Sequence, residues 1–213
     1  MYTKQNYQAP APLHGFSYLE YLPENYASGE NFPLVIFLHG AGERGEDVEK
    51  AAVHGWMKNV REGENFPFVM IAPQCPQGKY WGCYIESLNA FLTYALEKYQ
   101  VDPSRVILTG LSMGGTGTWL WSLANPERFA AVVPICGTGV YWNGEPLAKK
   151  PLWVFHGEAD TVVPVTESIN MVHGVRKYGG TPKLTIYPGV GHDSWVRAYA
   201  DPELIPWMLE QRL

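Results

Sequence analysis

Six short apolar runs recur along the 213-residue chain, and the segments between them are long enough to hold helices. The runs are continuous, without polar residues at every second position, which is typical of strands that are covered on both faces. They occupy residues 34–38, 68–72, 106–108, 131–135, 152–155 and 184–187. Alternating strands and helices predict a doubly wound, mostly parallel α/β sheet with helices on both faces, in which ligands bind beyond the carboxyl ends of the strands.

Helical periodicity appears in several of the intervening segments. Residues 84–99 place apolar side chains at three- to four-residue spacing and predict a helix with one buried side. Further helices are expected at 116–124, 166–178 and 202–212, the last with Asp201 as its cap, Pro202 in its first turn and a kink or a restart at Pro206. Residues 16–22 are rich in strand-forming side chains and predict an antiparallel strand at the edge of the sheet.

A single domain is expected to account for residues 1–213, with residues 1–15 as an N-terminal extension. The chain is long enough to bury one sizeable core, and it contains no repeat, low-complexity tract or break in composition. Only about 15 residues separate Ile135 from Pro151, which is too few for a helical lid. We therefore expect an open site without a substantial lid.

Charge and composition exclude several classes of protein. The formal net charge is −5, and the basic residues are scattered, so nucleic acid is not an expected partner. Residues 1–10 lack the apolar core of a signal peptide, and no apolar run is long enough to span a membrane. The expected setting is the cytoplasm, with no membrane partner.

Three cysteines are too few and too irregularly spaced for a disulfide scaffold. Buried free thiols are the default expectation for Cys75, Cys83 and Cys136. A bridge between Cys75 and Cys83 is the alternative.

The motif Gly-x-Ser-x-Gly occupies residues 110–114, between an apolar run and a helical segment. In this strand-turn-helix setting the motif predicts a sharp turn that exposes the hydroxyl of Ser112 at the edge of the sheet. Glycines are needed on both sides of the serine because larger side chains would collide with the neighbouring strand or helix.

A serine hydroxyl becomes a good nucleophile when a histidine, itself oriented by a carboxylate, removes its proton. Asp160 and His192 each follow an apolar run, and the chain order serine, acid, histidine is that of the α/β-hydrolases. Ser112 would attack the acyl carbon, His192 would transfer the proton, and Asp160 would hold the imidazole. Glu158 and Asp193 are the alternative acids.

The tetrahedral oxyanion requires preorganised N–H donors. Met113, directly after the serine, is expected to supply one, and Ala41 the other, with Gly42 as second choice. An ion pair between Glu43 and Arg44 is expected to hold this loop.

Two tryptophans and the remaining histidines have less specific roles. Trp81 and Trp195 are candidate walls of the substrate pocket, together with Gly42, although packing of the loops explains both tryptophans equally well. His39 and His156 are expected to hydrogen-bond nearby loops. The other histidines (His14, His54 and His173) form no pattern typical of a metal site.

Taken together, these segments resemble the α/β-hydrolase superfamily, and in particular the carboxylesterases often labelled predicted peptidases, which are related to dienelactone hydrolases and feruloyl esterases. The similarity covers the chain from about residue 16, and it is carried by Leu38-His-Gly-Ala-Gly-Glu-Arg-Gly45, by residues 101–115, by Trp153-Val-Phe-His-Gly157 and by Tyr187-Pro-Gly-Val-Gly-His-Asp-Ser-Trp195. The resemblance implies the fold, a triad of Ser112, Asp160 and His192, and ester hydrolysis without a cofactor or metal.

The activity expected from the sequence is that of a serine carboxylesterase, which hydrolyses small or short-chain esters through an acyl-enzyme intermediate. A peptidase or amidase with the same triad and a feruloyl-type esterase are the alternatives. A binding module without catalysis would lack a triad member or an oxyanion glycine, whereas this chain retains them all.

Overall fold

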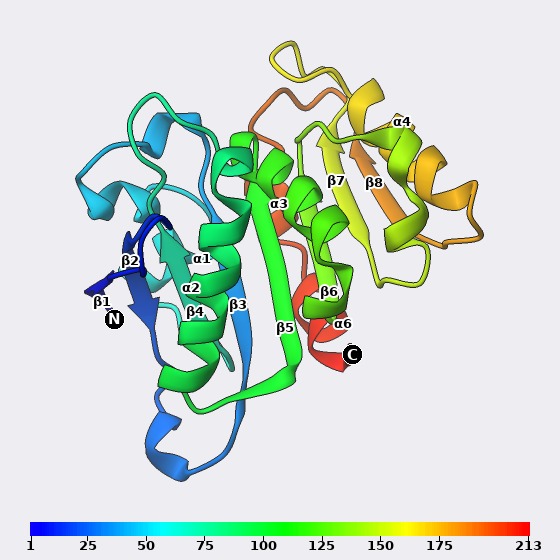
Figure 1. Ribbon diagram of the computed structural model, residues 1–213. Coiled ribbons are helices and arrows are strands. Elements are labelled where there is room, and N and C mark those ends of the chain that lie inside the picture. Colours follow the sequence, from blue (N-terminus) through cyan, green and yellow to red (C-terminus); the bar gives the residue numbers. More distant parts are fainter.

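One eight-stranded sheet organises the fold in the computed structural model, which describes residues 1–213 (Figure 1). The strands in chain order are β1 (Tyr2–Tyr7), β2 (Phe16–Tyr21), β3 (Phe32–Leu38), β4 (Val69–Pro73), β5 (Val101–Leu111), β6 (Ala131–Ile135), β7 (Trp153–Gly157) and β8 (Lys183–Tyr187). Their spatial order is β1-β2-β4-β3-β5-β6-β7-β8. The pairs β1–β2 and β2–β4 are antiparallel, and all other pairs are parallel. The predicted doubly wound, mostly parallel sheet is confirmed.

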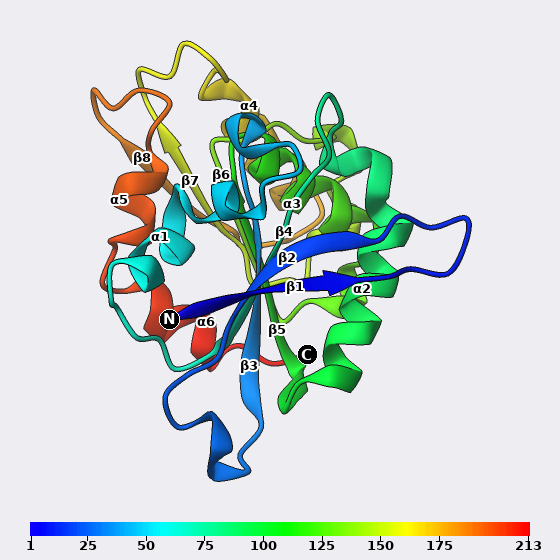
Figure 2. The same cartoon turned by 90° about the vertical axis from the view of Figure 1, so that its left-hand side faces the viewer.

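Six α-helices lie on the two faces of this sheet. They are α1 (Gly55–Arg61), α2 (Ile85–Lys98), α3 (Met113–Ala124), α4 (Thr166–Arg176), α5 (Trp195–Tyr199) and α6 (Leu204–Glu210). The view along the sheet shows α1, α5 and α6 on one side and α2 and α3 on the other (Figure 2). None of the helices combines the length and the apolar character that crossing a bilayer requires.

The hydrophobic core is divided by the sheet into two clusters. One joins alternate strand residues to α2, α3 and α4, with Phe91, Trp119 and Met171 fully buried. The other joins the opposite strand residues to α1, α5 and α6, with Trp56 and Leu204 among its members. Burial of a large apolar side chain contributes about 1.5–3 kcal/mol. The continuous apolar strands therefore reflect a sheet that buries both faces.

The order of the strands creates a switch point beside β3. β4 follows β3 on one side, whereas β5 lies on the other side of β3. The loops after β3 and β5 consequently diverge, and a ligand crevice forms at such a switch point.

Several local predictions were wrong at the edges of the fold. Residues 16–22 do not form the edge strand, because β1 pairs outside β2 over six residues of the segment predicted to be an extension. The last helix does not begin at residue 202: α6 begins at Leu204, close to the restart expected at Pro206, and the proline falls in the first turn, where its missing N–H breaks no hydrogen bond. Asp201 accepts a hydrogen bond from the Glu203 N–H (2.9 Å) and stabilises the turn before the helix. The cysteines are free thiols, but Cys83 is exposed instead of buried.

Candidate active site

Ser112 lies on the turn between β5 and α3 and has an unusual backbone conformation. Its φ is 54° and its ψ is −118°, a region that non-glycine residues seldom occupy. Hydrogen bonds fix it there: its N–H donates to the Ile135 carbonyl, and its own carbonyl accepts from the Thr116 N–H, both at 2.9 Å. An added Cβ at Gly114 would collide with the backbone of Leu38. The glycine is therefore required for the turn to approach β3.

The side chains of Ser112, His192 and Asp160 form a continuous hydrogen-bonded chain. His192 Nδ1 lies 2.7 Å from Asp160 Oδ2, and its Nε2 lies 2.8 Å from Ser112 Oγ. Because an ionised carboxylate only accepts, Nδ1 carries the proton and Nε2 is free to accept from the hydroxyl. The structure brings together the three residues predicted from the sequence, each from a loop at the carboxyl edge of the sheet.

The two alternative acids are placed differently. The Glu158 carboxylate accepts from the Gly189 N–H (3.0 Å), so it stabilises the loop before His192. Neither Glu158 nor Asp193 forms a hydrogen bond or an ion pair with the His192 ring.

Asp160 is held as a carboxylate by its surroundings. Burial alone raises the pKa of this carboxyl, but hydrogen bonds from His192 and from the N–H groups of Val163 and Val162 outweigh burial and lower the pKa below its usual value. The acid is therefore ionised at neutral pH, as orienting an imidazole N–H requires.

The predicted oxyanion loop, which follows β3, is anchored by His39. This imidazole donates from Nδ1 to the Gly40 carbonyl (2.6 Å) and accepts the Cys75 N–H at Nε2 (3.0 Å). Burial lowers the pKa of His39 to about 4, so the ring is neutral and both contacts persist at neutral pH. His39 therefore has the structural role expected of it.

Trp81 is not a wall of an accessible pocket. Its side chain is completely buried, and its indole N–H donates to the His39 carbonyl at 3.0 Å. Through this hydrogen bond the buried ring stabilises the loop after β3. Trp195, in contrast, is partly exposed and packs edge-on against His192, with ring centroids 5.3 Å apart.

Arg44 and Glu43 do not form the expected ion pair. The Arg44 guanidinium donates to the carbonyls of Ala41 (2.8 Å) and Lys79 (3.2 Å). The buried Glu43 carboxylate instead lies 3.7 Å from His54 Nε2. Hydrogen bonds from the Arg44 side chain to backbone carbonyls therefore hold this loop, and the residue types alone do not predict such contacts.

Cys136 is the thiol nearest to the triad. Its sulfur lies within 4.8 Å of ligand atoms of Asp160 and His192, a donor set that a metal ion can use. Burial raises the pKa of this thiol to about 12, so it is not a thiolate at neutral pH, and the other two groups already bind each other. Asp160 and His192 are therefore engaged in the hydrogen-bonded chain with Ser112, and the protonated Cys136 thiol is a poor metal ligand beside them.

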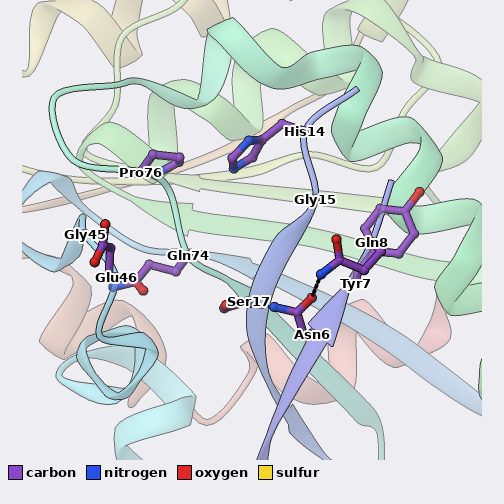
Figure 3. A pocket seen from close by; sticks show the side chains of 10 residues that line it. All are labelled: Asn6, Tyr7, Gln8, His14, Gly15, Ser17, Gly45, Glu46, Gln74 and Pro76. Carbon is purple, nitrogen blue, oxygen red and sulfur yellow. Dashed lines mark hydrogen bonds between the residues drawn. The ribbon is translucent and has the colours of Figure 1, made fainter. Parts of the chain in front are cut away.

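A polar pocket of about 420 Å³ adjoins the loop after β3 (Figure 3). The β1–β2 hairpin lines one side, and the loops after β3 and β4 line the other. Its polar lining includes Asn6, Gln8, His14, Ser17, Glu46 and Gln74. None of the triad residues lines this pocket, and neither Ala41 nor Met113 does, so it is separate from the candidate site.

Comparison with known proteins agrees with this geometry. A profile of the dienelactone hydrolase family matches residues 83–201, which is more than half of the chain. The chain belongs to the dienelactone hydrolase family. The match includes the turn at Ser112, Asp160 and His192, and the fold is the α/β-hydrolase fold of this family's esterase neighbours.

Individual relatives of this family member are esterases. A probable acetylxylan esterase A of Aspergillus terreus is 28% identical over 189 residues, covering 79% of this chain and 59% of the relative. A solved thermostable esterase superposes with a TM-score of 0.88 at 31% identity, covering 100% of this chain and 63% of that structure. A ferulic acid esterase shares the fold, with a TM-score of 0.77 at 19% identity and 98% coverage of both chains. The chain thus spans about three fifths of the length of the first two.

One contact near the site was not foreseen from the sequence. His156 Nε2 lies 3.2 Å from Asp160 Oδ2, the oxygen that also binds His192. The only signal in the sequence was the four-residue spacing of His156 and Asp160.

Proposed function

We propose that this protein is a serine carboxylesterase that hydrolyses small or short-chain esters through an acyl-enzyme intermediate. The observation that carries the proposal is the hydrogen-bonded chain from Asp160 through His192 to Ser112, with the serine on a strained turn. Esterases among the family's relatives support the same class of reaction. The cytoplasmic location inferred from the sequence stays a prediction.

The first half of the reaction forms the acyl-enzyme. Ser112 Oγ attacks the ester carbonyl carbon while its proton passes to His192 Nε2, and the negative charge moves to the carbonyl oxygen. The N–H groups of Met113 and Ala41 stabilise that oxyanion. Collapse of the tetrahedral intermediate breaks the bond to the alcohol oxygen, which takes the proton from His192.

The second half releases the acid. Water attacks the acyl carbon as His192 removes a proton from it, and the proton then returns to Ser112 Oγ as the acyl bond breaks. Asp160 remains ionised throughout and stabilises the imidazolium.

Short acyl chains are the expected substrates. The segment between β6 and β7 contains only two single-turn 3-10 helices, Tyr141–Asn143 and Glu145–Leu147, and so forms no helical lid that would cover a long acyl chain. Each extra methylene contributes about 0.8 kcal/mol only when the enzyme buries it. We expect kcat/KM for p-nitrophenyl acetate or butyrate to exceed that for the decanoate by at least about tenfold, or about 1.4 kcal/mol.

A panel of p-nitrophenyl esters of increasing chain length, with methyl ferulate and a matched amide, tests this proposal. Faster hydrolysis of the amide than of its ester would favour the peptidase alternative. A maximum at long acyl chains would contradict the short-chain preference, and a maximum at methyl ferulate would identify a feruloyl-type esterase.

A further inference from the structure

His156 is a fully buried histidine at the carboxyl end of β7, beside the proposed catalytic acid. Its Nε2 lies 2.9 Å from the Val163 carbonyl and 3.2 Å from Asp160 Oδ2. Its Nδ1 lies 2.7 Å from the hydroxyl of Ser168, which is on α4 and also fully buried. Every polar atom of the ring therefore has a partner inside the protein.

These partners define where the ring carries its proton. A carbonyl can only accept a hydrogen bond, so Nε2 must be protonated to donate to Val163. In the neutral ring Nδ1 is then an acceptor, and the Ser168 hydroxyl donates to it. The neutral tautomer with its proton on Nε2 satisfies all of these contacts.

The Asp160 carboxylate accepts three hydrogen bonds and also lies in contact with the His156 ring. Oδ1 accepts from the backbone of Val162 (2.8 Å) and Val163 (2.9 Å). Oδ2 accepts from His192 (2.7 Å), and His156 Nε2 lies 3.2 Å from the same oxygen. The backbone contacts fix one oxygen, and His156 is the only group besides His192 that fixes the other. Without His156, only the hydrogen bond to His192, which takes part in catalysis, would oppose rotation of the carboxylate at Oδ2.

We propose that His156 is a positioning residue that holds Asp160 Oδ2 in line with His192 Nδ1. The inference rests on the proposed function, because it assigns the work of His156 to the triad. His156 acts through Asp160 and contacts neither the substrate nor the reacting atoms. Misplacement of reacting groups by about 1 Å can cost about 10²-fold in rate.

The alternative role is purely structural. His156 also joins the loop at Val163 to α4 through Ser168, and these two contacts alone could serve only to fold the loop. Both roles use Nε2, which contacts Asp160 and also donates to the Val163 carbonyl, whereas only the tie to α4 uses Nδ1.

Two substitutions of similar size separate the contacts of Nε2 from the contact of Nδ1. In His156→Gln the terminal amide reaches the region of Nε2 and can donate toward Asp160, but the contact with Ser168 is lost. In His156→Asn the shorter amide reaches only the region of Nδ1, so it can keep Ser168 but cannot reach Asp160. Ser168→Ala is the control for the lost contact in the glutamine variant.

Steady-state kinetics on p-nitrophenyl acetate are expected to show kcat reduced between about tenfold and a hundredfold in His156→Asn with KM little changed. The glutamine variant should keep kcat within about fivefold of wild type, and Ser168→Ala should do so as well. Equal losses in both histidine variants, or a larger loss in His156→Gln, would overturn the proposal. The thermal unfolding midpoint of each variant is the check that all the compared proteins are folded.

Proton NMR of the wild type adds a test that needs neither substrate nor a substitution. ¹⁵N labelling of histidine is expected to show His156 protonated on Nε2 and not on Nδ1. The strongly downfield proton of His192 Nδ1, which reports its bond to Asp160, should move upfield in His156→Asn and stay in His156→Gln. An unprotonated Nε2, or a His192 resonance unchanged in the asparagine variant, would refute the positioning role even if the enzyme hydrolyses no ester tested.

Discussion

Ser112→Ala is expected to lower kcat for p-nitrophenyl acetate by about 10⁶-fold. The variant has no oxygen to form the acyl-enzyme, and the oxyanion donors and His192 can then assist only direct attack by water. The fold should persist because the hydrogen bonds that fix the turn come from backbone atoms. Equal thermal unfolding midpoints for the variant and the wild type would show that the fold persists.

Ser122→Ala provides the matched control. Ser122 lies on the same helix, α3, and its hydroxyl donates only to helix carbonyls, those of Thr118 and Trp119. We expect its kcat within about twofold of wild type. Substantial turnover in a pure, folded Ser112→Ala variant would contradict the nucleophile assignment.

Asp160→Asn is expected to reduce kcat by about 10⁴-fold. The asparagine side chain has one acceptor oxygen and one NH₂ group in a place where three N–H groups donate and the His156 ring lies close by. If its oxygen faces the backbone donors, the NH₂ group faces His192 Nδ1 and favours the tautomer that cannot accept the serine proton. The clash of donors should also lower the free energy of unfolding by about 1–3 kcal/mol.

The controls for Asp160 are its two alternatives in the sequence. Glu158→Gln and Asp193→Asn should each keep kcat within a few-fold of wild type, because neither side chain hydrogen-bonds to His192. Kinetics and urea unfolding of all three variants are the measurements. A loss in Asp193→Asn as large as that in Asp160→Asn would reassign the acid.

The sheet and the candidate triad could be predicted from the sequence because their signals are local and strong. Continuous apolar runs mark strands that are buried on both faces, and the glycines at 110 and 114 mark a turn that leaves no room for side chains. The loops carrying Asp160 and His192 then followed from the rule that parallel strands bring their carboxyl ends to one edge.

Features that depend on tertiary contacts were missed. β1 is polar, with Lys4, Gln5 and Asn6 in its centre, and becomes a strand only because β2 offers an unpaired edge. α5 spans five residues, too few to show helical periodicity. The burial of Trp81 beneath the loop after β3 and the separation of Glu43 from Arg44 depend on how distant loops pack, which residue types do not encode.

The central claim is that Ser112 is the nucleophile that forms the covalent intermediate. A fluorophosphonate probe reacts with serines activated in this way, and peptide mass spectrometry locates the adduct. We predict stoichiometric labelling of wild type at Ser112 and no adduct in folded Ser112→Ala. Folded wild type that stays unlabelled, or that carries the adduct on another residue, would contradict the account.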